Sequence, residues 1–322
     1  MVRMKRRPAA IFQAPGVIML AAACLLAGCA SSYIALKEET QDHIMTVKLI
    51  SVMPQPMVFA TEPPTFASTV RTELSLVGGL IGESFEAVRF RTAEKKLAPL
   101  ASPSLGIEFR NNMADGLRRA ADRSGRLIVQ ELISTDQPVG TSDREKTLFE
   151  MTEDALLVVT TRYYLTPDFR IFNVWSQVEL WSKKSRSLIY RGQWFVHSVP
   201  HSPGEGEQTA ERVIAAWAGN QAAAYKSAEH DAVEESALME RVELLHEPVL
   251  QQSAIIAIGY VEPRNGKLLT MNGQMLLNRH GWAIVRTEDG NLHALPSPEA
   301  SNAPEAPDAQ AATAQAQENG TP

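Results

Sequence analysis

The chain has 322 residues, 44% of them hydrophobic, and its 37 acidic residues outnumber its 31 basic ones, giving a formal net charge of −6. This acidic balance argues against a nucleic-acid partner, because binding to phosphates requires a basic surface. Both cysteines, Cys24 and Cys29, lie near the N-terminus. The chain after residue 29 therefore offers no disulfide, no thiolate nucleophile and no cysteine-bound metal.

The N-terminal segment has the pattern of an export signal. A basic stretch at residues 3–7 precedes an apolar run at 17–26, which is shorter than the roughly 20 residues that a spanning helix needs. The run ends in Leu26-Ala27-Gly28-Cys29, which resembles the lipobox of bacterial lipoproteins. The alternative is an ordinary signal peptide with an accidental cysteine near its cleavage site.

The lipobox resemblance implies a location for the protein. In that family a signal peptidase cleaves before the cysteine, so Cys29 would become the acylated first residue of the mature chain. The residue after the cysteine is Ala30 rather than an aspartate, and in that family this favours export to the outer membrane. The resemblance therefore implies a protein on the periplasmic face of the outer membrane. Several acyl chains on one residue hold a protein to a bilayer, whereas a single chain binds only marginally.

Composition divides the chain into six parts. Residues 29–43 are polar and mixed in charge, and the segment from 297 has no aromatic or basic residue, as expected of a tether and a disordered tail. The predicted parts are a signal peptide (1–28), a lipidated tether (29–43), an α/β domain (44–200), a helical segment (201–250), a small β unit (251–296) and the tail (297–322).

The first half of the α/β domain alternates strands with helices. A β-branched run at 44–53 predicts a strand that ends at Pro54. The apolar run at 74–82 (LSLVGGLIG) is interpreted as the start of an amphipathic helix whose glycines permit close packing on a sheet; the alternative is a small-residue helix contact within lipid. A second helix should end at Gly125, followed by a largely buried strand at 127–133 and a short helix at 141–151. The predicted buried face of the helix that ends at Gly125 contains Ile107, Phe109, Met113, Leu117 and Ala120.

Residues 155–199 predict an antiparallel three-stranded meander. Strand-length runs at 155–165, 171–181 and 187–199 are separated by the turn signals Thr166-Pro167-Asp168 and Lys183-Lys184-Ser185-Arg186. In the middle run, at 171–181, successive side chains point to opposite faces of the sheet. One set is apolar and should face the covering helices, and the other is a mixed aromatic face that should remain partly exposed. The apolar set is Phe172, Val174, Val178 and Leu180, and the opposite set is Asn173, Trp175, Gln177, Glu179 and Trp181.

The remaining elements complete an α+β fold class: a mixed or antiparallel sheet with a meander covered by amphipathic helices, plus a small C-terminal β unit. Two helices are predicted after residue 206. On the second, Leu238, Val242 and Leu245 share a face while Glu234, Glu235, Glu240 and Glu243 point mostly outward. A strand at 254–261 precedes the β unit, in which Asn272-Gly273 predicts a hairpin and Asp289-Gly290-Asn291 a turn.

This order of elements, with "DALLVV" at 154–159 leading into a meander, resembles the α/β domain of periplasmic lipoproteins related to curli secretion and to penicillin-binding-protein activators. The turn at 183–187 departs from the Asp and Thr-Gly that such proteins carry. The run at 78–82 followed by "RTAEKKLAP" also resembles a group of uncharacterised proteobacterial lipoproteins. Neither resemblance implies a catalytic residue.

Tests for catalytic chemistry find no strong pattern. The nearest approach to a serine elbow, at 82–86, lacks its final glycine. His197 and His201 have the spacing of metal ligands on a helix, but Pro200 lies between them, so two solvent-facing histidines near a turn are expected. Asp154 is interpreted as a junction residue, Asp168 as a turn residue and Glu179 as an exposed strand position. No catalytic residue, metal ligand or cofactor site is predicted.

Trp175 and Trp181 are the candidate partner-binding residues, because they share a strand face with polar side chains, as in a partly wet interface. We therefore expect a non-enzymatic envelope lipoprotein, anchored through Cys29, that binds an envelope protein or assembles with itself. The alternatives are an envelope hydrolase that uses carboxylates in a cleft beside the C-terminal unit, and a carrier of an apolar ligand.

Overall fold

The computed structural model describes residues 33–55, 57–58, 95–202, 204, 209–245, 255–261, 268–279 and 281–297. Cys29, the apolar run at 74–82 and the predicted tail lie outside these residues. The helices are α2 (Glu38–Gln41), η2 (a 3-10 turn, Ala98–Leu100), α5 (Pro103–Ser124), α6 (Thr141–Glu150) and α7 (Ala210–Glu243). The strands are β1 (Thr46–Val52), β2 (Ile128–Thr135), β3 (Ala155–Leu165), β4 (Phe172–Ser182), β5 (Ser187–His197), β6 (Ile255–Val261), β7 (Leu268–Arg279), β8 (Trp282–Thr287) and β9 (Leu292–Pro296).

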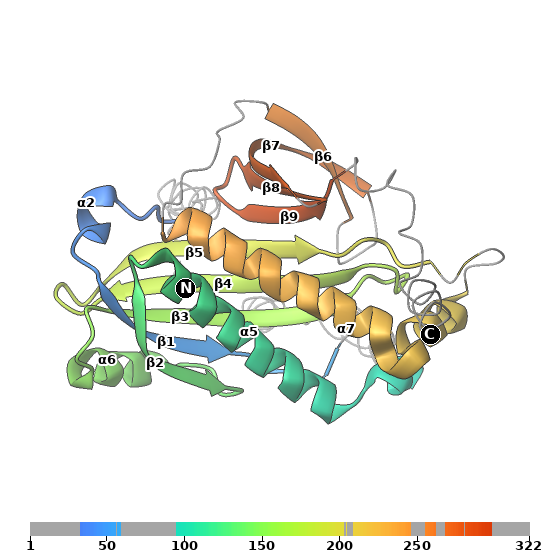
Figure 1. Ribbon diagram of the computed structural model, residues 1–322, viewed down its shortest axis with the longest axis horizontal. Helices are drawn as coiled ribbons and strands as arrows, with labels where there is room; N and C mark the ends of the chain where they lie inside the picture. The colour runs from blue at the N-terminus through green and yellow to red at the C-terminus, as the bar shows by residue number, and fades with distance from the viewer. Residues whose placement is uncertain are drawn as a thin grey trace, which may run out of the picture. The chain divides into compact units, whose positions relative to one another are not determined.

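The described strands form one mixed sheet in the order β2-β1-β3-β4-β5-β9-β8-β7-β6 (Figure 1). β1 pairs in parallel with β2 and β3, while β3, β4 and β5 form the antiparallel meander. Among the C-terminal strands β6 to β9, each strand is antiparallel to its neighbour. β9 joins the meander through a short parallel pairing with β5. The predicted α+β fold with a meander and a C-terminal β unit is confirmed.

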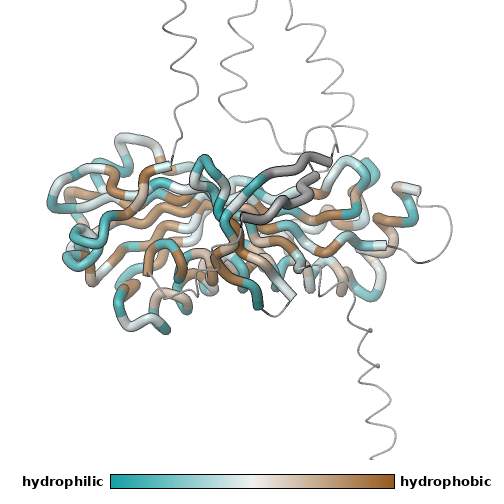
Figure 2. Tube along the Cα trace, turned by 90° about the horizontal axis from the view of Figure 1, so that it is seen from above, coloured by the Kyte–Doolittle hydropathy of each residue, from teal (hydrophilic) through white to brown (hydrophobic). Residues whose placement is uncertain are grey.

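The face of the sheet beneath α5 and α7 carries the main hydrophobic core. Figure 1 shows both helices lying across the meander strands, and Figure 2 shows hydrophobic residues concentrated along the strands. The predicted apolar set of β4 is buried here, as are Phe109, Met113, Leu117 and Ala120 of α5. Ile107 is an exception, because it is 50% exposed, and its place on the predicted buried face was wrong.

On the opposite face, Trp175, Gln177 and Trp181 of β4 are neither fully buried nor fully exposed, as the prediction of a partly exposed face requires. A helix that the prediction did not place there nevertheless lies on this face of the sheet. α6 packs there and forms a second core with β1 and β3, made of Ile50, Val52, Leu148, Met151, Leu156 and Val158. The prediction missed this because α6 buries a single side chain of its own, Leu148. β2 is also more exposed than predicted, since it is the edge strand of the described sheet.

α7 has a break at Gly219, where the backbone leaves helical geometry through residue 222. Asn220, Gln221 and Ala222 have positive φ, so the segment consists of two helical pieces. The number of helices is as predicted, but the first was expected to continue past this break, with Ala224 on the same face as Val213 and Trp217. The acidic residues of α7 do not point outward as predicted: Glu235, Glu240 and Glu243 are buried, and only Glu234 of that set is exposed. The reason is that α7 contacts α5 on one side and the strands β4, β5 and β9 on another.

Three further observations concern the predicted tether and the C-terminal β unit. Ile34 makes an antiparallel bridge to Arg191 of β5, so this part of the predicted tether is attached to the sheet. Asn272 and Gly273 lie within β7 rather than in a hairpin turn, since both pair with neighbouring strands. A Cβ at Gly273 would lie 2.4 Å from Val285 Cγ1, so glycine there permits close strand approach. The predicted turn at 289–291 does separate β8 from β9, with Gly290 at φ 84°.

Candidate functional site

Trp175 and Trp181 share one face of β4, as predicted, but their surroundings differ. We call this face, which points away from α5 and α7, the second face of the meander. The two tryptophans are six residues apart on one strand, which corresponds to about 20 Å. Trp181 is half-buried against the second core, and the guanidinium carbon of Arg144 from α6 lies 4.0 Å from the centre of its ring. Trp181 Nε1 also donates to Glu179 Oε2 over 3.1 Å. These contacts give Trp181 a structural role in fastening α6 to the sheet.

Glu179 is the centre of a hydrogen-bonded cluster rather than an exposed strand position. Its carboxylate accepts from Gln177 Nε2 over 3.1 Å and from Trp181, and forms an ion pair with Arg191 Nη2 at 3.0 Å. The Glu179 side chain is 13% exposed. The prediction of exposure was wrong because these three side chains cover it, and a carboxylate so occupied is committed to holding β4 and β5 in register.

Trp175 lies at one end of an aromatic row that crosses β4, β5 and β9. Its ring stacks on Phe195, with 6.5 Å between centroids, and Phe195 stacks on His293 with 4.6 Å between centroids. The Arg162 guanidinium lies 5.5 Å from the centre of the Trp175 ring. Trp175 remains only half-buried in this arrangement. We call Trp175, Phe195, His293 and Arg162 the aromatic row.

His197 extends the row into the protein interior. Its Nδ1 is 2.7 Å from Asn173 Oδ1 and its Nε2 is 3.2 Å from His293 Nδ1. Burial lowers the pKa of His197 well below its ordinary value and that of His293 to about 4, so both rings are neutral near pH 7. The expectation of a solvent-facing His197 was wrong, because the parallel pairing of β5 with β9 covers its ring.

His201 does not join His197. Its ring lies against Trp217 of α7, with 4.5 Å between centroids, and burial lowers its pKa. Across the parts of the chain that the structure describes, no group of three or more His, Cys, Asp or Glu side chains could hold a metal ion.

Asp154 and Asp168 occupy the predicted junction and turn. Asp154 Oδ2 accepts from Met45 N and from both Thr46 N and Oγ1. Burial raises the pKa of Asp154, but these hydrogen bonds outweigh it and leave the pKa below its ordinary value. Asp168 Oδ1 accepts from Arg170 N at 3.2 Å within the turn between β3 and β4.

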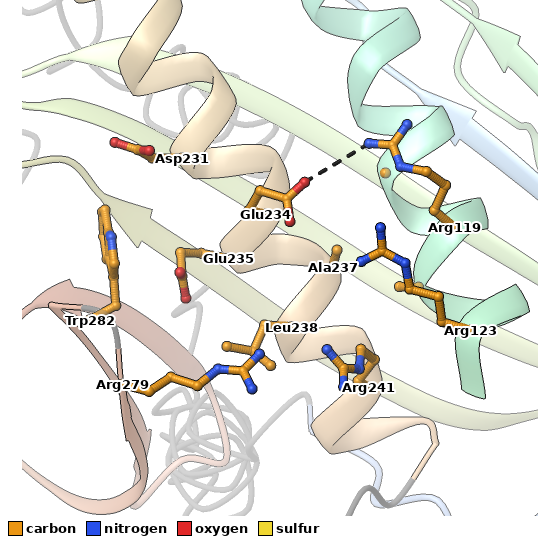
Figure 3. Close-up of a pocket in the computed structure, with 12 residues that line it drawn as sticks. Arg119, Arg123, Asp231, Glu234, Glu235, Ala237, Leu238, Arg241, Arg279 and Trp282 are labelled. Carbon is orange, nitrogen blue, oxygen red and sulfur yellow. Dashed lines mark ion pairs between the residues drawn. The ribbon is translucent and has the colours of Figure 1, made fainter. Parts of the chain in front are cut away.

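A pocket of about 280 Å³ lies where α5 and α7 meet β7 and β8 (Figure 3). Four arginines line it: Arg119 and Arg123 of α5, Arg241 of α7 and Arg279 of β7. Asp231, Glu234 and Glu235 of α7 line it as well, with Leu238 and Trp282 among its less polar walls. Arg119 and Glu234 pair at 4.0 Å, and both are exposed.

Glu235 is the buried acid of this pocket. It is 9% exposed, and its Oε2 has no hydrogen-bond partner among the described residues. Burial raises its pKa to about 7, with Asp231 and Glu234 adding to the rise and Arg279 opposing it. The pocket is not evident from the sequence, because charges on exposed helix faces are usually solvated. The one available signal was Arg119 and Arg123 at i and i+4 on α5.

No family model and no curated protein matches the chain. Among solved structures it is similar to the hypothetical protein CT253 from Chlamydia trachomatis, at 10% identity and a TM-score of 0.32, covering 63% of this chain and 99% of that one. It is also similar to protein XCC0632 from Xanthomonas campestris, of family DUF330, at 9% identity and a TM-score of 0.28, covering 66% of this chain and 93% of that one. The protein therefore has distant structural similarity to these bacterial proteins, at TM-scores that support no argument about function.

Proposed function

We propose that the protein is a non-enzymatic lipoprotein of the bacterial envelope that binds an envelope protein or a second copy of itself. In this proposal acyl chains on Cys29 hold it to the periplasmic face of the outer membrane. The support for the anchor is the sequence Leu26-Ala27-Gly28-Cys29 after a basic stretch and a short apolar run. In the described part of the chain, no helix is long and apolar enough to cross a bilayer.

The single observation that carries the binding proposal is the aromatic row on the second face of the meander. Trp175 is large, half-buried and held by stacking on Phe195, with a guanidinium beside it. Rigid aromatic side chains beside arginine are the residues that most often dominate the binding energy of protein interfaces. Trp181 is less suited to that role, because Arg144 and Glu179 already occupy it.

Affinity capture tests the proposal directly. The full-length protein is crosslinked in intact cells with a short amine-reactive reagent, and captured partners are quantified for wild type, Trp175→Ala and Phe149→Ala. Phe149 is the matched control, because it is a 72% exposed aromatic on α6 away from the row. We expect Trp175→Ala to lose a partner that wild type and Phe149→Ala retain. Equal capture by all three would contradict a binding role for Trp175.

A second candidate function, hydrolysis by carboxylates, is favoured by the pocket beside the C-terminal strands. Asp231 and Glu235 both line it and are one helical turn apart, about 5–6 Å between Cβ atoms. A buried carboxyl with a pKa near 7 can act as a general acid. The test is the release of reducing sugar from purified peptidoglycan: release by wild type that Glu235→Gln abolishes supports the hydrolase, and no release by wild type contradicts it.

A further inference from the structure

The pocket between α5, α7, β7 and β8 has a basic side and an acidic side. Figure 3 shows Arg241 and Arg279 on either side of Leu238, and Arg123 directed toward Ala237, the residue before Leu238. In the same view Asp231 and Glu235 lie on the side of Trp282. Arg119 and Glu234, which also line the pocket, pair with each other, so the charges separate only in part along the pocket, although the chain as a whole is acidic.

Glu235 supplies an independent sign that the pocket is built for a ligand. Leaving a buried acceptor without a hydrogen bond is unfavourable, and Glu235 Oε2 is such an acceptor within the described structure. Figure 3 shows its carboxyl group directed toward Arg279 and Trp282. A ligand that brings a hydrogen-bond donor to this side would satisfy the acceptor.

The basic side of the pocket has enough guanidinium N–H donors to bind an anionic group with more than two oxygens. A carboxylate has two oxygens, which one arginine can satisfy through a bidentate pair. The three guanidinium groups come from three different elements, α5, α7 and β7. Arg241 already has another interaction, but each guanidinium carries five N–H donors, so together the three can also match the larger number of acceptor oxygens on a phosphate. The volume of about 280 Å³ is near the lower limit of ligand pockets, roughly 300 Å³, which suits a small ester.

We propose that this pocket binds a small phosphate ester that carries an ammonium group. The phosphate lies between Arg123, Arg241 and Arg279, and the ammonium lies against Glu235 and Asp231. The Trp282 ring borders the ammonium, where a cation over an aromatic face is attracted. This inference concerns a different surface from the aromatic row and does not depend on the protein partner proposed above.

Isothermal titration calorimetry with three probes tests the ligand class. The full-length chain, purified in a non-ionic detergent, is titrated with O-phosphoethanolamine, with inorganic phosphate and with ethanolamine. We expect O-phosphoethanolamine to bind at least about tenfold more tightly than either half alone, because only it satisfies both sides of the pocket. Three equal affinities, or the absence of saturable binding, would overturn the proposal.

Paired variants locate the binding. Arg123→Gln should raise the Kd for O-phosphoethanolamine by about tenfold or more. The control is Arg118→Gln, because Arg118 is also exposed on α5 and pairs with Asp122 outside the pocket. Glu235→Gln should weaken the binding of O-phosphoethanolamine without weakening the binding of inorganic phosphate, since the substitution alters only the ammonium side of the pocket. Equal effects of Arg118→Gln and Arg123→Gln would contradict the assignment to this pocket.

The same chemistry occurs in soluble esters and in a lipid headgroup, so a further probe distinguishes the sources. Dihexanoylphosphatidylethanolamine is titrated below its micelle concentration, in competition with O-phosphoethanolamine. Tighter binding of the short-chain lipid assigns the site to a headgroup, whereas binding of the free ester alone assigns it to a soluble molecule. Failure of both probes to bind overturns the inference and leaves the protein-partner proposal untouched.

Discussion

Gly116 of α5 lies so close to α7 that a Cβ atom at position 116 would be 2.4 Å from Val233 Cγ1. This contact fixes how closely the two helices approach, and Gly116 also lines the pocket between them. Glycine is unfavourable within a helix by about 1 kcal/mol relative to alanine, so its presence here reflects the need for close packing.

Gly116→Ala should therefore destabilise the protein by about 1–3 kcal/mol, because overpacking outweighs the gain in helix propensity. The measurement is a double-mutant cycle with Val233→Ala, in which the free energy of unfolding is determined by denaturant titration. The double variant should lose less stability than the sum of the single variants, since shortening Val233 makes room for the new methyl group. Strict additivity would show that the two positions are not coupled.

Glu240 should make stability depend on pH. It is 0% exposed, neither carboxyl oxygen has a partner within the described residues, and burial together with Asp122 raises its pKa well above the ordinary value. As pH rises from about 4.5, the unfolded chain ionises at Glu240 while the folded protein retains its proton, so stability is lost toward the folded pKa.

Glu240→Met should accordingly stabilise the protein by about 1–3 kcal/mol, with a larger gain at pH 8 than at pH 5. The melting temperature measured at both pH values checks this. Glu234→Met is the matched control, because Glu234 is exposed on the same helix, and its effect should be small at both pH values. A gain for Glu240→Met that is larger at pH 5 would contradict the assignment.

The two faces of β4 should respond differently to substitution. Val178 is 0% exposed under the helices, so Val178→Asp buries an unpaired charge and should unfold the protein. Trp175→Ala removes a half-buried ring and should cost only about 1–2 kcal/mol. Circular dichroism melts compare the two variants, and a folded Val178→Asp beside an unfolded Trp175→Ala would invert the face assignment.

The anchor is tested separately from the fold. Cys29→Ser should give an uncleaved precursor that a labelled fatty acid does not mark, because the acyl acceptor is lost. Labelling with radioactive palmitate followed by gel analysis distinguishes mutant from wild type. Equal labelling of both proteins would remove the basis for a lipid anchor at Cys29.

The meander could be predicted from sequence because the patterns that specify it, side-chain alternation and turn residues, are local in the chain. In β4 the side chains alternate between two faces, and the buried set Phe172, Val174, Val178 and Leu180 follows directly from that period. Turn residues at 166–168 and 183–186 bounded the strands correctly. Neither signal requires knowledge of distant parts of the chain.

The buried glutamates of α7 could not be predicted in the same way. A helical pattern separates one apolar face from one polar face, whereas α7 is covered on more than one side, by α5 and by the sheet. Glu243, for example, is buried because Arg286 of β8 pairs with it and Tyr33 donates to it. Those partners are distant in sequence, and no local pattern contains them.

The aromatic row and the pocket depend on long-range pairings for the same reason. His197 meets His293 only because β9 runs parallel to β5, 96 residues further along the chain. The pocket combines residues of α5 with others near positions 235 and 279. Sequence identified Trp175 through its strand position, but its neighbours Phe195 and His293 became evident only in the folded sheet.

Site-specific photocrosslinking at position 175 tests the central claim, that the second face of the meander binds an envelope protein. A benzophenone amino acid replaces Trp175 in full-length protein expressed in intact cells, and the control carries it at Asn112, an exposed position on α5. The proposal predicts a discrete crosslinked protein at position 175, or a crosslinked dimer of this chain, that is absent at position 112. No adduct at position 175, or the same adducts at both positions, would contradict it.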